Sequence, residues 1–223
     1  MTKDHPAGLV TGLFTGKVAH PWDGREPTAI AKAPQHGPVH IGPLGLDGDE
    51  QADTRVHGGH DQAVHHYADE HHTHWVQTFA EDATRFHPGN FGENISSTGL
   101  TEETLCIGDV LSIGTAIVQV TQGRQPCWKL NAHIGREDMA YQFRKTARTG
   151  WYYRVIEPGK VSTGDRIELQ ERPLADWTIA DVTRAHFAAR LDMKKAAQLA
   201  ALEPLSARWR ESFRAKADAK PTP

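Results

Sequence analysis

The chain has 223 residues, and 25 Lys and Arg stand against 28 Asp and Glu, which leaves a formal net charge of −3. Because phosphate contacts require an excess of basic residues, this balance argues against stable nucleic-acid binding, and the presence of only 2 cysteines excludes a disulfide framework or a four-cysteine zinc site. No apolar run approaches the roughly 20 residues that span a bilayer, and the first residues form no apolar signal core, so we expect a cytoplasmic protein that makes no contact with membranes.

Up to residue 172 the chain shows short strands separated by Gly and Pro. The candidate strands lie at 9–18, 28–32, 104–107, 110–114 and 115–122, and a strand pair is expected around Gly164 between 161 and 169. In the segment 116–122, Ala116, Val118 and Val120 share one face, which is the period of two of a half-buried strand. The spacing of the turns predicts a compact, barrel-like β fold.

Two helices are expected to interrupt the strands. One begins near Asp69 and runs to about Phe79, with Trp75 and Phe79 four residues apart on one face. The other spans roughly 136–148, where Met139 and Phe143 follow a helical period. The strands and these helices together make residues 1–172 one predicted domain, mainly β with flanking helices.

The composition changes near Pro173, after which Ala, Lys and Arg dominate. Thr178, Asp192 and Ser206 are suitable N-caps for three successive short helices, and Pro204 must end the second of them. Residues 173–223 are therefore predicted to form a C-terminal three-helix bundle appended to the barrel.

Eight of the 14 histidines fall between positions 57 and 87, a density that suggests zinc because imidazole is the commonest metal ligand. The spacing weakens this interpretation. His71, His72 and His74 would point to different faces of one helix, and His65 and His66 are neighbours, so on a strand only one of the two can face a given site. A zinc hydrolase built on the cluster stays an alternative that elemental analysis would decide.

The segment VHGGHD at 56–61 is more informative. Gly58 and Gly59 permit positive φ and a close approach of the backbone to a ligand. Asp61 could hydrogen-bond a ring nitrogen of His57 or His66 and so set its tautomer. The alternative interpretation of the segment is a tight turn capped by Asp61.

The two cysteines lie in different settings. Cys106 stands in an apolar segment and is expected to be a buried packing residue. Cys127 follows a predicted strand, between Arg124 and Lys129, whose charges would stabilise a thiolate that attacks a substrate or binds a soft metal. A structural cysteine and a Cys-His hydrolase are the alternatives for this residue.

Two other polar residues are placed where they could meet a ligand. Asn94 stands in a turn that enters a strand, and its amide could bind a polar group, although the segment also fits an ordinary turn. Lys32 ends an apolar segment and either extends to solvent or points into a site that binds an anion.

Five segments, taken together, resemble a MOSC domain, the module named after the C-terminus of molybdenum-cofactor sulfurases. They are GLDGDEQA at 45–52, VHGG at 56–59, FGEN at 91–94, RQPCWKLN at 124–131 and GKVSTGD at 159–165. Their order and spacing resemble the YiiM-like branch, which also carries a C-terminal three-helix appendage. The resemblance covers most of residues 8–220.

The resemblance implies a small closed or partly closed β-barrel and a molybdenum cofactor (molybdopterin) whose metal takes the thiolate of Cys127. Related enzymes reduce N-hydroxylated compounds, and the YiiM-like branch is associated with N-hydroxylated purine bases. The cofactor phosphate would need cations. Candidate cofactor contacts are Lys32, Arg55, Gly58, Gly59, Asn94, Arg124 and Lys129. His57 or His66 could supply a proton, oriented by Asp61.

The resemblance also has departures and gaps. His60 and His65 stand where we expect other residues in the relatives. We expect no pyridoxal phosphate, because the lysine that binds it in the sulfurases belongs to an N-terminal domain without a counterpart in these residues. Electrons are then expected from a separate donor protein, and the C-terminal helices are expected to serve docking or homodimer contacts, or to cover one end of the barrel. A sulfur or cofactor carrier that uses Cys127 is the alternative function.

Overall fold

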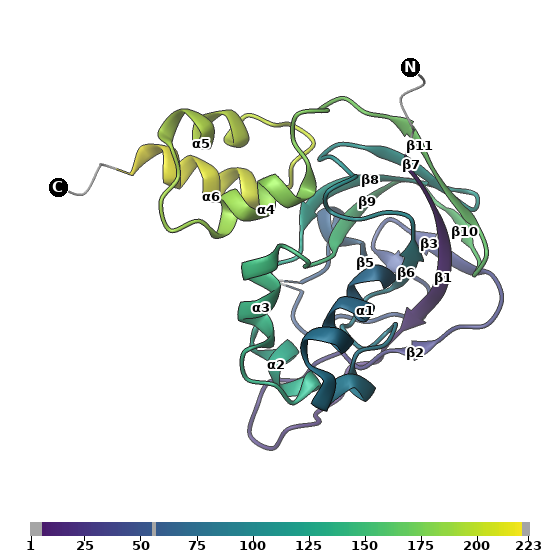
Figure 1. Cartoon of the computed structure of the whole chain (residues 1–223). Helices are drawn as coiled ribbons and strands as arrows, with labels where there is room; N and C mark the ends of the chain where they lie inside the picture. Colours follow the sequence, from purple (N-terminus) through teal and green to yellow (C-terminus); the bar gives the residue numbers. More distant parts are fainter. Residues whose placement is uncertain (1–5, 55–56, 220–223) are drawn as a thin grey trace.

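The computed structural model describes residues 6–54 and 57–219, and its centre is a barrel with helices on the outside (Figure 1). The barrel strands follow one another in the order β1, β11, β7, β8, β9, β5 and β6, and β6 pairs with β1 to close the ring. Their bounds are β1 Ala7–Thr15, β5 Val64–Ala68, β6 Ile95–Thr98, β7 Val110–Ile113, β8 Ala116–Gly123, β9 Trp151–Glu157 and β11 Arg166–Glu171. The pair β5–β6 is parallel and the other barrel pairs are antiparallel, so the predicted barrel fold is confirmed.

The barrel interior is filled by the alternating side chains of its strands. On β8, Ala116, Val118 and Val120 are fully buried, as their period of two predicts. The same apolar cluster continues without a break into the C-terminal helices, where it includes Ile179 and Phe213. These helices therefore share the core of the barrel.

Three expectations about strands are wrong. The segment 28–32 forms only an isolated bridge at Thr28, and 104–107 is a turn with an isolated bridge at Cys106. The segments around Gly164 do not pair with each other: β10 (Gly159–Val161) joins β3 (Val39–Gly42) and β4 (Gly45–Leu46) in a small sheet, whereas β11 pairs in the barrel. A short β2 (Ala33–Pro34) pairs with the end of β1. These partners are distant in sequence, so local propensity does not select them.

Helices α1 (Asp69–Thr78), α2 (Trp128–Ile134) and α3 (Met139–Thr146) lie together at one end of the barrel (Figure 1). Two 3₁₀ helices, η1 (His60–Gln62) and η2 (Ala80–Arg85), flank α1 in the sequence. An aromatic cluster fills the space beneath the helices, where Trp75 and Phe143 stack with ring centroids 5.4 Å apart. The first and third helices were expected from the sequence, but the second was not.

Helices α4 (Ile179–Phe187), α5 (Met193–Ala200) and α6 (Ala207–Asp218) form a group beside the barrel, and α4 packs on β8 (Figure 1). The side chains of Thr178, Asp192 and Ser206 each accept the backbone N–H three residues further on, so all three predicted N-caps are confirmed. The expected boundary at residues 172 and 173 falls between β11 and α4. Within the described ranges, none of the helices has the length and apolar character needed to cross a bilayer.

Gly150, just before β9, lies close to β5, to the residue after β8 and to the turn after β6. Its N–H donates to Glu102 Oε1 (2.6 Å) and its carbonyl accepts the Arg124 N–H (3.0 Å). Its φ is +71°, and a Cβ added to it would lie 2.4 Å from the His66 carbonyl oxygen. Both the backbone conformation and the space therefore require glycine here.

Replacing this glycine tests the close approach of residue 150 to β5. Gly150→Ala is expected to lower the free energy of unfolding by about 3 kcal/mol, because it adds a clash to the strain of a positive φ. Gly164→Ala is the matched control, since Gly164 has φ +93° with nothing within 4 Å of an added Cβ. Its cost should be only about 1 kcal/mol. Equal losses in urea denaturation would contradict the packing described here.

Candidate functional site

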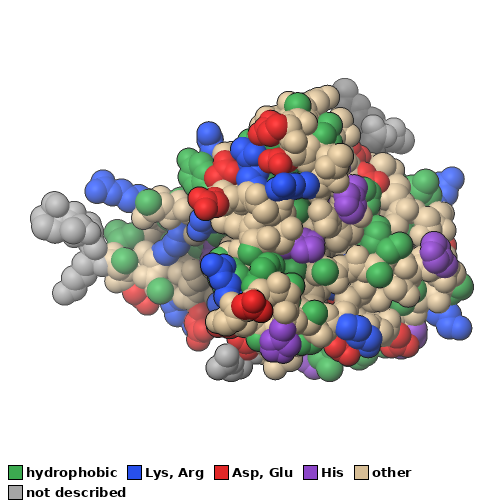
Figure 2. Space-filling model, turned by 90° about the horizontal axis from the view of Figure 1, so that it is seen from below, with side chains coloured by type: hydrophobic (Ala, Val, Ile, Leu, Met, Phe, Trp, Pro, Cys, Tyr) green, Lys and Arg blue, Asp and Glu red, His purple; other side chains and the backbone are tan. Residues whose placement is uncertain are grey.

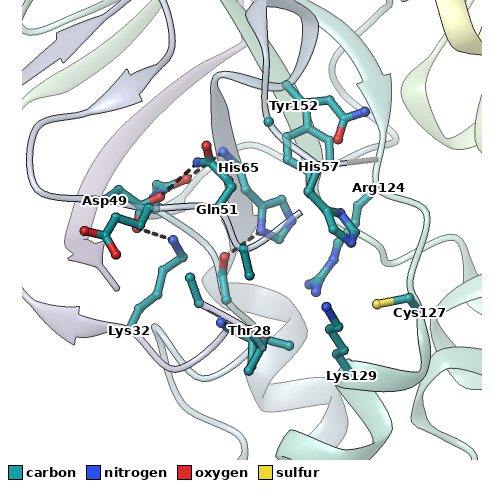
Figure 3. A pocket seen from close by; sticks show the side chains of 18 residues that line it. Thr28, Lys32, Asp49, Gln51, His57, His65, Arg124, Cys127, Lys129 and Tyr152 are labelled. Atoms are coloured by element: carbon teal, nitrogen blue, oxygen red, sulfur yellow. Dashed lines mark hydrogen bonds and ion pairs between the residues drawn. The ribbon is translucent and has the colours of Figure 1, made fainter. Parts of the chain in front are cut away.

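A cleft of about 630 Å³, counted out to open solvent, lies at the end of the barrel where β8 leads into α2 (Figure 3). This size falls within the range of small-molecule and cofactor sites. Its walls come from the loop segments 28–32 and 49–52, from His57, Gly58 and Gln62, from His65 on β5 and Tyr152 on β9, and from the segment 124–129. Segments far apart in the sequence thus meet around one opening.

Cys127 lines this cleft as a half-buried free thiol at the N-cap of α2. Two cations flank it, and both are almost fully buried. Arg124 donates to the Phe91 carbonyl (2.5 Å), and Lys129 Nζ donates to the Pro27 carbonyl (2.9 Å). Figure 3 shows both cationic groups on the same side of the cleft as the thiol. A soft ligand next to desolvated positive charge suits a metal-bound anionic group.

His57 lies on the same side of the cleft as Cys127, and its ring is beside Arg124 (Figure 3). Burial lowers the pKa of its imidazole, and the charges of Arg124 and Lys129 lower the pKa further. The imidazole is therefore mostly neutral at pH 7. It gains its proton at a lower pH than an ordinary histidine does.

The opposite wall contains a buried ion pair. Lys32 Nζ pairs with the Asp49 carboxylate, and the two side chains are 6% and 2% exposed. Burial lowers the pKa of Lys32 although Asp49 opposes the shift. Asp49 also accepts the Gly16 N–H (2.7 Å) and an N–H of the Asn94 amide (2.8 Å). Lys32 lines the cleft as predicted, but Asp49 already balances its charge.

Asn94 also lines the cleft, and its amide holds the surrounding segments together. Oδ1 accepts the His65 backbone N–H (3.0 Å), while Nδ2 donates to Asp49 and to the Phe14 carbonyl (3.3 Å). The Asn94 side chain thereby continues the hydrogen bonding between β5 and β6 one residue beyond the pair His66–Ile95. Its first role is to position β5 and Asp49 at the cleft.

The histidine of β5 that faces the cleft is His65, not the predicted His66. His66 lies in the barrel interior, with Nδ1 2.9 Å from the Tyr153 hydroxyl and Nε2 2.7 Å from the Ser97 hydroxyl. Burial lowers the pKa of His66 to about 3. The alternation of the strand turns His65 to the other face, where its Nδ1 is 3.3 Å from the Gly92 carbonyl. The structure therefore does not bring His66 to the site.

Asp61 is also placed differently from the prediction. Its carboxylate accepts from the Arg154 guanidinium (Nε 3.1 Å) and from the Ala207 N–H (3.1 Å). These contacts connect the barrel to the first turn of α6, and neither involves His57 or His66. Asp61 does not line the cleft. It instead links the barrel to α6.

The two glycines predicted to approach a ligand have different surroundings. Gly58 lines the cleft with φ +75°, and an added Cβ would lie 2.7 Å from Gln51 Oε1. Gly59 has φ +81° and open space around it, outside the cleft walls. Arg55, another predicted cofactor contact, lies outside the described residues.

The structure does not gather the histidines into a metal centre. Among the residues it describes, no group of three or more His, Cys, Asp or Glu side chains could hold a metal ion. On the face seen in Figure 2 the histidines are scattered singly. Two of them instead face buried carboxylates: His71 Nε2 lies 2.5 Å from Glu102, and His72 Nε2 lies 3.5 Å from Glu93. The zinc alternative has no site within this part of the chain.

Glu93 is a fully buried residue that the sequence analysis did not single out. Burial would raise the pKa of Glu93, but the neighbouring His72, a backbone hydrogen bond and His65 together more than offset this effect, and the pKa falls to about 2. The carboxylate accepts the N–H groups of Gly89 (2.6 Å) and Phe91 (3.0 Å). It therefore fixes the loop whose Phe91 carbonyl receives Arg124. In the sequence, only its position within the FGEN segment at 91–94 pointed to Glu93.

Comparison with known proteins gives two family matches. The MOSC domain model matches residues 53–168, and the model of the YiiM-like, 3-alpha helix domain matches residues 177–216. Protein YiiM of Escherichia coli is 40% identical over 197 residues, which cover 88% of this chain and 87% of that protein. The crystal structure of YiiM from Geobacillus stearothermophilus superposes with a TM-score of 0.80 at 32% identity, over 94% of this chain and 99% of that one.

A third relative has a name that states an activity. A protein called Reductase, from Gibberella moniliformis, is 33% identical over 179 residues. The match covers 79% of this chain but only 32% of that protein.

The placement of Asp61 predicts a structural effect without an effect on the titration of His57. Asp61→Ala should lower the free energy of unfolding by about 1–2 kcal/mol, because α6 loses an N-terminal hydrogen-bond acceptor and Arg154 loses its carboxylate partner. Amide hydrogen exchange in the first turn of α6 should accelerate, whereas the titration of His57 followed by NMR stays the same. Glu168→Ala, an exposed carboxylate on β11, is the control. An altered His57 titration with unchanged α6 exchange would contradict this assignment.

Proposed function

The chain belongs to the MOSC domain family, in its YiiM-like branch, and we propose that it is a molybdenum-cofactor-binding reductase of N-hydroxylated compounds. The observation that carries the proposal is the free thiol of Cys127 in a cleft, beside the buried cations Arg124 and Lys129. The relative named Reductase supports the redox part of the proposal.

The residues of the cleft fit the chemistry of the cofactor. Cys127 offers a soft thiolate for the metal, and Arg124 and Lys129 offer positive charge for the phosphate of the pterin. His65 Nε2 is buried without a hydrogen-bond partner among the described residues, as expected of a group that a ligand satisfies. When bound, the cofactor supplies two-electron reduction.

The remaining residues have supporting roles in the proposed reaction. Reduction of N–OH to N–H takes two electrons and two protons and releases water. His57 would hold one of these protons at the cleft, next to Cys127, while the buried Lys32–Asp49 pair keeps the opposite wall in place. We propose that the electrons come from a separate donor protein.

The ligand role of Cys127 is tested by metal content. After expression in a host that makes the cofactor, the wild-type protein should contain stoichiometric molybdenum and pterin, and Cys127→Ser should lose both, because a serine hydroxyl is a poor ligand for a soft site. Cys106→Ser is the matched control, since Cys106 is buried away from the cleft. It should load like the wild type.

Two results would contradict the proposal. Full molybdenum loading of Cys127→Ser would remove the assigned ligand. A persulfide on Cys127 by mass spectrometry, in protein that turns over no N-hydroxylated compound, would favour the sulfur carrier instead.

The proton-holding role of His57 predicts a pH dependence. Because burial and the neighbouring cations lower the pKa of His57, the protonated fraction grows as the pH falls through a value below the ordinary one. The kcat/KM should therefore rise from pH 8 towards pH 5, and His57→Gln should lose this rise together with about 10²-fold in kcat.

The neighbouring His60 provides the control for this experiment. Its side chain is exposed and outside the cleft, so His60→Gln should keep both the rate and the pH profile. A wild-type profile in His57→Gln would show that another group delivers the proton.

A further inference from the structure

Helix α1 presents two adjacent histidines to two different buried carboxylates. The helix lies against β5 and β6 (Figure 1), and His71 and His72 are 6% and 5% exposed. Because successive residues of a helix point about 100° apart, the two imidazoles face different neighbours. His71 meets Glu102, in the turn after β6, and His72 meets Glu93, in the loop before β6. Burial would raise the pKa of both carboxyl groups, but the facing histidines and hydrogen bonds from backbone N–H groups lower each pKa below its ordinary value, so both groups are ionised at neutral pH.

The first of two series of contacts leads from His71 to the backbone of Arg124. His71 Nε2 lies 2.5 Å from Glu102 Oε2, and the other oxygen of Glu102 accepts the Gly150 N–H (2.6 Å). The Gly150 carbonyl in turn accepts the Arg124 N–H (3.0 Å). This series, the backbone relay, holds the main chain at the point where it leaves β8, three residues before Cys127.

The second series leads from His72 to the guanidinium of the same arginine. His72 Nε2 lies 3.5 Å from Glu93 Oε1, an ion-pair distance, and the His72 ring stacks on the ring of Phe91 with centroids 5.1 Å apart. Glu93 Oε2 accepts the Phe91 N–H (3.0 Å), and the Phe91 carbonyl accepts an N–H of Arg124 Nη1 (2.5 Å). This series, the side-chain relay, sets the position of the guanidinium at the cleft.

The two relays converge on one residue of the cleft. They begin at neighbouring positions of one helix and end at the backbone N–H and at the guanidinium of Arg124. A long side chain with several rotatable bonds keeps a precise position only when its surroundings hold it. None of the residues that the structure places in the walls of the cleft belongs to α1. The position of a buried positive charge at the site thus depends on a helix that does not line the site.

We propose that His71 and His72 are positioning residues, which hold Arg124 in place for an anionic group through Glu102 and Glu93. The proposal rests on the proposed function, in which that group is the phosphate of the cofactor. The two histidines touch neither cofactor nor substrate and act through the carboxylates. Each relay therefore controls a different end of Arg124, which a general effect on folding would not do.

NMR of the full-length protein tests the two relays separately at Arg124. His71→Phe removes the partner of Glu102, so hydrogen exchange of the Arg124 backbone N–H should become about three- to tenfold faster, the factor that corresponds to one hydrogen bond, while the guanidinium signals stay as in the wild type. His72→Phe keeps the ring stack but removes the partner of Glu93. It should change the guanidinium signals and leave the exchange of the backbone N–H as it is.

Further variants separate positioning from folding. His71→Gln and His72→Gln each keep a donor N–H near the position of Nε2, and should restore the wild-type behaviour. His71→Asn and His72→Asn, whose amides are too short to reach the carboxylates, give the same test as the phenylalanine variants if a phenylalanine does not fit. His74→Phe, on the same helix but in neither relay, is the matched control and should change neither end of Arg124.

One pattern in these data would overturn the proposal. If the variants of His71 and of His72 perturb both ends of Arg124 equally, in proportion to a fall in the free energy of unfolding, the two histidines only stabilise the fold. Wild-type signals and exchange at Arg124 in every variant would overturn it as well.

Retention of the cofactor extends the test to the site. After expression in a host that makes the cofactor, His71→Phe and His72→Phe should each lose pterin about three- to tenfold faster than the wild type during dialysis, because Arg124 holds the phosphate less well. The glutamine variants and His74→Phe should retain pterin as the wild type does.

Failure of the relays and failure of the proposed function give different results. A wild-type protein that contains molybdenum and pterin, with Arg124 signals that no variant alters, would refute the relays and leave the proposed function. Selective changes at the two ends of Arg124, in a protein that binds neither molybdenum nor pterin, would support the relays and refute the proposed function.

Discussion

The site depends on the contacts of Arg124, whose guanidinium is buried. Its backbone N–H donates to Gly150 at the start of β9, and its side chain donates to Phe91 in the loop before β6. With 7% exposure it is held by two segments that are distant from it in sequence. The short segment from Arg124 to Cys127 therefore has little freedom, and the thiol faces the cleft.

The charge of Arg124 matters as much as its hydrogen bonds. Burial lowers the pKa values of His57 and His65, and the Arg124 charge is the next largest cause of both shifts. The cleft thus combines neutral imidazoles with positive charge that water does not screen. Such surroundings favour a bound anion, and this links the geometry to the proposed cofactor.

Buried carboxylates hold the loops around this centre. Glu93 accepts the N–H groups of its own loop, Glu102 accepts that of Gly150, and Asp49 accepts that of Gly16. Histidines of α1 face two of these carboxylates, which gives part of the histidine excess a structural reason. The sequence allowed the N-caps and the β8 face to be predicted because both are local patterns. It allowed Cys127 to be selected because the flanking cations are close in the chain.

The parts of the fold and of the site that were not predicted depend on contacts between residues that are distant in the sequence. All five residues of β5 are buried, so no polar face could distinguish His65 from His66. Asp61 was assigned to nearby histidines, whereas its partners are Arg154 and the N–H of Ala207, which lie 93 and 146 residues away. Helix α2 was missed because it has 7 residues and its N-cap, Cys127, is not a typical capping residue.

Anomalous diffraction at the molybdenum edge, from crystals of the cofactor-loaded protein, tests most directly whether Cys127 binds the metal. The expected result is one molybdenum peak in the cleft, within bonding distance of Cys127 Sγ and on the side of Arg124 and Lys129. A peak elsewhere, or a metal in the cleft out of bonding reach of that sulfur, would contradict the proposed site.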